Sequence, residues 1–269
     1  MDITEHPPFV SHDSILSTHG RRTKRAYVLL HGLTATPLQF AAFGRLLYDR
    51  GANVYIPRLP RHGHADRLTT VLRDLTAAEL RAFATEALAA ARELGREVVV
   101  AGFSVGGLMS AWIGQHYAVA RSVSVAPFLG FAFLPQALTG RAARLALRAP
   151  NQFWWWDPLL RERFGPEHGY PRFATHAVAE AATLAHELLA DARSRVPATA
   201  DLHVVLNARE TTVSNAAARR LAQAWTRSGR TVGLHRIPGL PLSHDIIEPG
   251  RFPTLARRVY PRLLELVAS

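Results

Sequence analysis

Three polar side chains in this sequence could together attack a carbonyl group: Ser104, Glu210 and His244. Ser104 is the centre of the run G-F-S-V-G at 102–106, which follows the apolar residues 98–100 and precedes a helical pattern. A serine flanked in this way is typical of a sharp, strained strand-to-helix turn that exposes the hydroxyl. Glycines are expected there because a side chain would collide with the neighbouring strand and helix. Taken alone, an ordinary glycine turn explains the run equally well.

The order of the three residues favours the chemical interpretation. Each follows a separate predicted strand, so their side chains are expected at the same edge of a parallel sheet. His244 would accept the proton of Ser104 during the attack and return it to the leaving group. Glu210 would hold the imidazole tautomer and stabilise its charged form. The sequence therefore predicts a serine–acid–histidine triad.

Other carboxylates suit the acid role less well than Glu210. Asp245 and Glu248 follow His244 so closely that neither is expected to turn back onto the far ring nitrogen. Asp201 precedes its strand and so belongs at the opposite edge of the sheet.

The segment 27–33 reads as a buried strand that runs into a turn. Backbone N–H groups from such a turn, and from the residue after the nucleophile, can hold the oxyanion of acyl transfer. Here those donors would be Leu33 and Val105. His31 is interpreted mainly as a structural residue that orients the turn, with a substrate contact as a second possible role.

The loop after the strand pattern at 53–57 contains His62, His64 and Asp66, which alternate like metal ligands. A ligand cluster would need further histidines at fitting positions, and the next residue is Arg67. The sequence favours a polar loop here and predicts neither a metal nor a cofactor.

Strand and helix patterns alternate along the chain, which implies right-handed crossovers and a parallel sheet. Thr36 and Thr76 are placed to cap helices, Thr76 in a capping box with Glu79. Beyond the segments already described, strands are expected at 121–127, 202–207 and 231–237, and a last helix near 255.

The sheet pattern disappears from about 128 to 196. We expect a helical cap there, inserted after the strand that follows the nucleophile helix and lying over the carboxyl ends of the strands. Trp154, Trp155 and Trp156 are candidate substrate-binding residues: at least one is expected to pack the cap onto the body, and the others to line an acyl pocket. The predicted domains are a core, 1–127 with 197–269, and a cap, 128–196.

Composition narrows the class of protein. With 269 residues and 48% hydrophobic content, one α/β domain with an insertion fits at least as well as two domains. The net charge of +11 comes from scattered arginines, with Lys24 the sole lysine, and such scatter argues against nucleic-acid binding. A mild preference for anionic surfaces or substrates stays open.

The chain contains no cysteine, which excludes disulfides and thiolate zinc sites. Residues 1–20 contain no continuous apolar run, and no stretch approaches the length of a membrane span. We therefore expect no signal peptide, no stable membrane insertion and a cytoplasmic location.

These motifs together resemble the α/β-hydrolase superfamily, and within it the bacterial carboxylesterases and monoacylglycerol lipases. The matching runs are H-G-L-T at 31–34, L-P-R-H-G at 59–63, G-F-S-V-G at 102–106, E-T-T-V at 210–213 and S-H at 243–244. The resemblance implies an α/β-hydrolase fold, with a mostly parallel central sheet flanked by helices, that hydrolyses carboxylic esters without a cofactor or metal.

Two positions depart from the pattern of that group. Arg61 stands where the group usually has glycine, and Glu210 stands where it usually has aspartate, although glutamate serves in some relatives.

The expected function is that of a serine esterase acting through an acyl-enzyme on small to medium esters with an apolar acyl group. Thioesters, amides and peptides remain alternative substrates of the same triad. A catalytically silent ligand-binding protein of this fold is a further alternative, and salt-sensitive binding of nucleic acid or anionic membranes through arginines is the last. The sequence makes no prediction of the oligomeric state.

Overall fold

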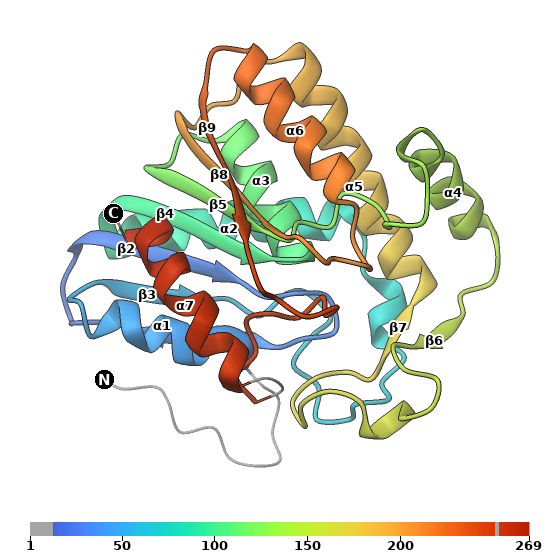
Figure 1. Ribbon diagram of the computed structural model, residues 1–269. Coiled ribbons are helices and arrows are strands. Elements are labelled where there is room, and N and C mark those ends of the chain that lie inside the picture. The colour runs from blue at the N-terminus through green and yellow to red at the C-terminus, as the bar shows by residue number, and fades with distance from the viewer. Residues whose placement is uncertain (1–12, 251–252, 269) are drawn as a thin grey trace.

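The computed structural model describes residues 13–250 and 253–268, and a central sheet of seven strands organises them (Figure 1). The strand order is β1-β3-β2-β4-β5-β8-β9, and each neighbouring pair is parallel except β1 with β3. The strands are β1 (Ile15–Ser17), β2 (Thr23–Leu30), β3 (Asn53–Ile56), β4 (Gly95–Phe103), β5 (Arg121–Val125), β8 (Asp201–Asn207) and β9 (Thr231–Ile237). The mostly parallel sheet expected from the sequence is confirmed.

Helices cover both faces of this sheet (Figure 1). On one face α1 (Ala41–Tyr48) contacts α7 (Pro253–Ala268). On the other, α2 (Ala77–Leu94), α3 (Val105–His116), α5 (Thr175–Ser194) and α6 (Asn215–Arg227) contact one another in a layer. The central strands β2, β4, β5 and β8 are mostly apolar and buried between the two layers, as their hydrophobic runs predict, whereas the edge strand β9 is largely exposed or half-buried.

One predicted helix cap forms and one does not. Thr76 accepts from the Glu79 N–H, and the Glu79 carboxylate accepts from the Thr76 N–H, so the capping box is confirmed. Thr36 precedes the short 3-10 helix η1 (Pro37–Phe40), but its hydroxyl makes no cap bond. The hydroxyl instead contacts Nδ1 of His168 at 2.9 Å, because the insertion brings that ring against it.

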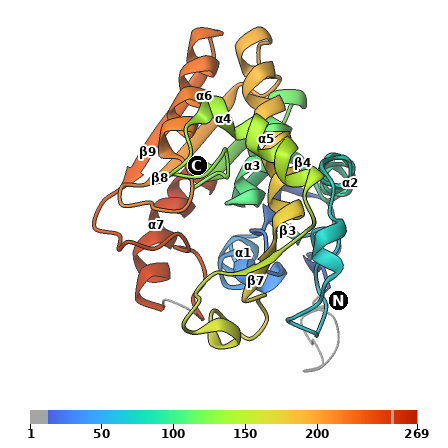
Figure 2. The same ribbon diagram turned by 90° about the vertical axis from the view of Figure 1, so that its right-hand side faces the viewer.

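The insertion between β5 and β8 differs in two respects from the expected helical cap. It contains a two-stranded antiparallel sheet, β6 (Phe153–Trp155) with β7 (Arg172–Ala174), beside the helix α4 (Gln136–Arg148) and the 3-10 helix η3 (Arg161–Arg163). In addition, α5 packs on α2, α3 and α6 and so joins the helix layer of the body. The part that lies outside this layer is therefore α4, β6, β7 and their loops (Figure 2).

Within the described ranges, no helix has the length and apolar content that crossing a membrane requires. Residues 1–12, on which the expected absence of a signal peptide partly rests, lie outside those ranges.

Candidate active site

Ser104 lies on the turn between β4 and α3 with a φ of 57° and a ψ of −116°. A positive φ is costly for a residue other than glycine, so the turn is strained. A Cβ on Gly102 would collide with the carbonyl of Gly106, and a Cβ on Gly106 would collide with the carbonyl of Leu30 in β2. The close approach of β4, α3 and β2 therefore requires glycine at both positions.

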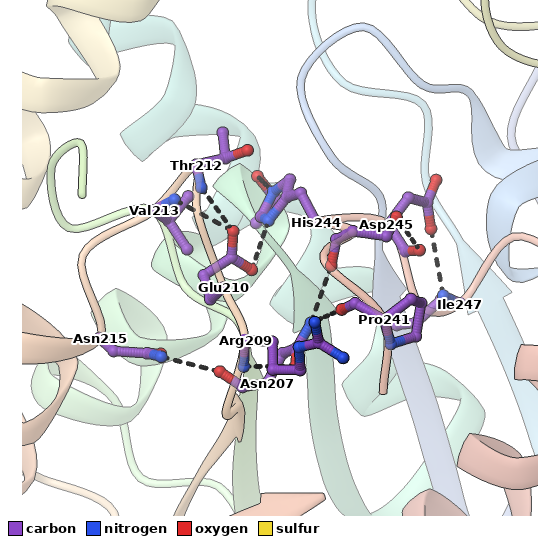
Figure 3. A network of polar contacts seen from close by, with 12 residues as sticks. Asn207, Arg209, Glu210, Thr212, Val213, Asn215, Pro241, His244, Asp245 and Ile247 are labelled. Atoms are coloured by element: carbon purple, nitrogen blue, oxygen red, sulfur yellow. Dashed lines mark hydrogen bonds and ion pairs between the residues drawn. The ribbon is translucent and has the colours of Figure 1, made fainter. Parts of the chain in front are cut away.

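The structure brings the three predicted polar residues together although they lie far apart in the sequence. The Ser104 hydroxyl is 2.8 Å from Nε2 of His244, and Nδ1 of His244 is 2.9 Å from the Glu210 carboxylate. Figure 3 shows the second of these contacts between the loops that follow β8 and β9. The His244 ring also lies against the Phe103 ring, with the ring centroids 4.8 Å apart.

The Glu210 carboxylate is fully buried and held at both oxygens. One oxygen contacts His244, and the other accepts hydrogen bonds from the backbone N–H groups of Thr212 and Val213 at 2.8 and 3.3 Å. Burial alone would raise the pKa of Glu210, but these hydrogen bonds outweigh burial and leave the pKa below its usual value. The ionised carboxylate can only accept, so Nδ1 of His244 donates and Nε2 of the neutral ring is free to accept from Ser104.

Asn207, the last residue of β8, joins the two loops that carry Glu210 and His244 (Figure 3). Its side-chain amide donates to the carbonyls of Pro241 and Ser243 at 3.2 and 2.8 Å, and its side-chain oxygen accepts from the N–H of Arg209 at 2.9 Å. Asn207 was not among the residues predicted from the sequence. An asparagine at the end of an apolar strand was the available signal, since asparagine is depleted in strands.

Gln39 makes a second connection, between the turn after β2 and the His244 loop. Its side-chain oxygen accepts from the N–H of Gly32 at 2.9 Å, and its amide donates to Asp245 at 3.2 Å. This buried residue was also not singled out, because its partners lie in segments distant in sequence.

Leu33 and Val105, the expected oxyanion donors, both line the cavity beside Ser104. Val105 is the first residue of α3, and the first N–H groups of a helix have no acceptor within it. The neighbouring Thr34 N–H donates to Nε2 of His62 at 3.3 Å. That bond orients the turn that carries Leu33.

His31 is completely buried and does not line the cavity, so the expected substrate contact is wrong for this residue. Nε2 of His31 accepts from the Leu59 N–H at 3.1 Å, and Nδ1 therefore donates to the Gly32 carbonyl at 2.9 Å. These two contacts orient the loop, as the structural interpretation of His31 predicts. Burial, together with the neighbouring His62, holds the pKa of His31 well below its usual value.

Burial likewise lowers the pKa of His62 to about 4. Its Nδ1 contacts the Pro60 carbonyl at 2.8 Å, and its Nε2 accepts from Thr34. Both ring nitrogens are thus engaged, which leaves His62 no lone pair for a metal ion and agrees with the polar-loop interpretation.

A cavity of about 260 Å³ opens above Ser104 and His244. Aromatic rings from the body and from the insertion form much of its wall: Phe103, Phe128, Phe131, Trp156 and Phe164.

The three tryptophans of the insertion have different positions. Trp156 lines the cavity, and its ring N–H donates to the Thr34 hydroxyl at 2.8 Å. Trp154 is 59% exposed, and neither it nor Trp155 lines the cavity, so the structure gives no support to the substrate contact that was predicted for these two residues. In the β6–β7 pair, the ring of Trp154 packs against Phe173 with the ring centroids 6.2 Å apart, and the remainder of this ring faces solvent.

Solved structures of lipolytic enzymes have a similar fold at low sequence identity. The chain matches a structure reported for the metagenome-derived lipolytic enzymes LipS and LipT with 16% identity and a TM-score of 0.67, covering 98% of this chain and 99% of that one. It matches a monoacylglycerol lipase of Paleococcus ferrophilus with 16% identity and a TM-score of 0.68, over 95% and 99% of the two chains. For a monoglyceride lipase variant of Saccharomyces cerevisiae, the identity is 11%, the TM-score 0.63 and the coverage 100% and 96%.

Sequence comparisons give the family. No curated protein sequence matches the chain. The model of the alpha/beta hydrolase family matches residues 27–249, which contain the strained serine turn and both loops that contact it. The chain therefore belongs to the alpha/beta hydrolase family.

Proposed function

We propose that this protein is a serine hydrolase that cleaves carboxylic esters through an acyl-enzyme. The observation that carries the proposal is the pair of contacts at 2.8 and 2.9 Å that joins Ser104, His244 and Glu210 at the floor of the cavity. A hydroxyl bonded to an imidazole that is itself oriented by a buried carboxylate is the arrangement that activates serine as a nucleophile.

The proposed reaction has two halves. Oγ of Ser104 attacks the ester carbonyl carbon while Nε2 of His244 takes the hydroxyl proton, and the protonated ring then gives that proton to the departing alcohol. Water next attacks the acyl-enzyme with the same imidazole as base, which releases the acid and restores Ser104. Glu210, kept ionised by its hydrogen bonds, stabilises the charged ring in both halves.

In this reaction, the N–H groups of Leu33 and Val105 would hold the negative oxygen of the tetrahedral intermediate. Each such donor contributes roughly a hundredfold to a thousandfold to the rate in comparable sites. The strain at Ser104 and the buried bonds of Gln39 support this role, because they fix the turn and the helix start before substrate binds.

The size and lining of the cavity support small to medium esters with an apolar acyl group. The volume of about 260 Å³ lies just below the range of small-molecule sites, roughly 300–1,000 Å³, and so favours a small substrate. Aromatic side chains favour burial of an apolar group. The lipases named above act on esters, which is consistent with this proposal. The proposal also includes a cytoplasmic location and a reaction that requires neither a metal nor a cofactor.

Hydrolysis of p-nitrophenyl esters from acetate to palmitate, by wild type and by Ser104→Ala, tests the proposed function. We expect activity that peaks at a short to medium acyl chain and falls by about 10⁴-fold or more in the variant. Equal rates in the two proteins would contradict the proposal. If only thioesters or amides are cleaved in a manner that requires Ser104, the triad would stand and the ester assignment would fail.

A further inference from the structure

Arg67 holds one wall of the cavity without lining the cavity itself. It follows the histidine-rich loop after β3, and its guanidinium points into the insertion loop 162–169. Four carbonyls of that loop accept from it: Nε donates to Gly169 at 2.8 Å, Nη1 to Glu162 at 3.0 Å, and Nη2 to Phe164 and Pro166 at 3.0 and 3.2 Å. The loop is thus wrapped around one side chain of the body.

The same loop contributes the cavity wall opposite the body. Five of its residues line the cavity: Phe164, Gly165, Pro166, His168 and Gly169. Three of the four carbonyls bound by Arg67 belong to lining residues, namely Phe164, Pro166 and Gly169. The position of this wall therefore depends on the hydrogen bonds that Arg67 donates to the loop from the side away from the cavity.

We infer that Arg67 is a positioning residue that sets substrate specificity by fixing this wall, an inference that rests on the proposed function. Guanidinium suits the task because it carries five donors in a rigid plane and can serve several carbonyls at once. A lysine has its donors on a single flexible nitrogen and cannot reproduce the spread of these four bonds. His168 also connects the loop to the body, through contacts with Thr36 at 2.9 Å and with Glu248 at 3.3 Å. These contacts hold only the end of the loop that lies nearest to β7 in the sequence.

Loss of the four bonds should affect substrates according to how far they reach toward the wall. We expect the acetyl group of an acetate ester to stop short of the loop. The acyl group of the ester that is hydrolysed fastest is expected to contact it. Arg67→Ala should therefore raise KM for the best ester about tenfold or more, while kcat for the acetate ester changes less than about threefold. The preference among chain lengths should flatten, and Arg67→Lys should give an intermediate profile.

The experiment compares wild type, Arg67→Ala, Arg67→Lys and the control Arg163→Ala. Arg163 is an exposed arginine of the same loop, so its removal changes the charge equally without removing the four bonds. Two ester series are measured, one with varied acyl chains and one with varied alcohols, because the wall could face either part. Amide hydrogen exchange across 162–170 is followed in parallel, and we expect about tenfold faster exchange in Arg67→Ala only.

The two readouts separate this inference from the proposed function. Faster exchange with a flattened profile in either ester series supports the role of Arg67, with Arg163→Ala like wild type. Unchanged exchange, or unchanged profiles in both series, overturns it. If wild type hydrolyses no ester in a manner that requires Ser104, the proposed function fails instead, and the exchange result still reports whether Arg67 orders the loop.

Discussion

The body and the insertion of this protein hold their functional side chains in different ways. In the body, Ser104, Glu210 and His244 follow strands of one sheet, and buried hydrogen bonds fix the turns that carry them. In the insertion, Trp156 and the loop 162–169 are tied to the body by half-buried contacts. Under the proposed function, the body would specify the reaction and the insertion would specify what enters the site.

Exposure of apolar side chains separates the two regions as well. Of the large hydrophobic side chains that are exposed among the described residues, six lie on the part of the insertion outside the helix layer: Phe133, Leu138, Leu145, Trp154, Leu159 and Leu160. Removing one buried partner in the body costs about 1–3 kcal/mol, whereas exposed contacts cost much less. Because buried polar contacts fix the triad whereas the insertion contributes cavity wall, we expect substitutions at those buried contacts to change mainly kcat and substitutions in the cavity wall of the insertion to change mainly KM.

The largest effect in this comparison after loss of Ser104 is expected for the buried acid. Glu210→Gln keeps the size of the side chain but removes the charge that stabilises protonated His244, so kcat should fall by about 10³-fold to 10⁴-fold. The matched control is Glu248→Gln, since Glu248 is a buried acid near His244 that lines the cavity but does not contact the His244 ring. A larger loss in the control, measured by steady-state hydrolysis, would mean that the acid is misassigned.

Asn207→Ala should lower kcat about tenfold to a hundredfold with little change in KM. The substitution leaves the Pro241 and Ser243 carbonyls without their donor and loosens the His244 loop relative to Glu210. Asn151, which accepts from the His176 N–H in the insertion, provides the control. Equal losses of kcat in Asn207→Ala and Asn151→Ala would break the distinction between the two regions.

Acid pH should weaken the body through His62. The folded protein holds this ring neutral with a pKa of about 4, whereas the unfolded chain binds the proton near the ordinary value of about 6.5. The unfolded state therefore binds more protons as pH falls, and the free energy of unfolding should drop by about 3 kcal/mol between about pH 6.5 and 4. Urea unfolding across this range measures the drop, which should shrink in His62→Asn; an undiminished drop would remove His62 as its cause.

The smallest effect is expected for the tryptophans of the insertion. Trp156→Phe removes the bond to Thr34 and part of the cavity wall, so KM should rise about threefold to tenfold while kcat is nearly unchanged. Trp154→Phe should leave both constants within about twofold of wild type, because Trp154 faces solvent. Similar KM values for the two variants would show that Trp156 does not contact substrate.

Local patterns were sufficient to predict the sheet and the residues at its carboxyl edge. Parallel strands appear as apolar runs, and a triad in the order serine, acid, histidine follows from which strand ends carry polar residues. The capping box at Thr76 is local in the same sense, since both of its partners lie within four residues. These features could be derived without knowing how distant segments meet.

The features that were missed depend on contacts between distant segments. Thr36 was expected to cap its helix, but His168 takes its hydroxyl, 132 residues away in sequence. Asn207 stands out locally only as an asparagine at the end of an apolar strand, and Gln39 does not stand out; only the folded chain shows that both join loops. The positions of the three tryptophans could not be predicted one by one, because contacts with distant residues, such as the bond of Trp156 to Thr34, place the rings.

The most direct test of the central claim is to trap the acyl-enzyme. Wild type turning over p-nitrophenyl acetate would be quenched in acid, digested, and its peptides analysed by mass spectrometry. We predict an added acetyl group on Ser104 alone, and a larger acetylated fraction in Glu210→Gln if that variant slows deacylation more than acylation. Turnover with no acyl group on Ser104, or with the group on another residue, would contradict the account.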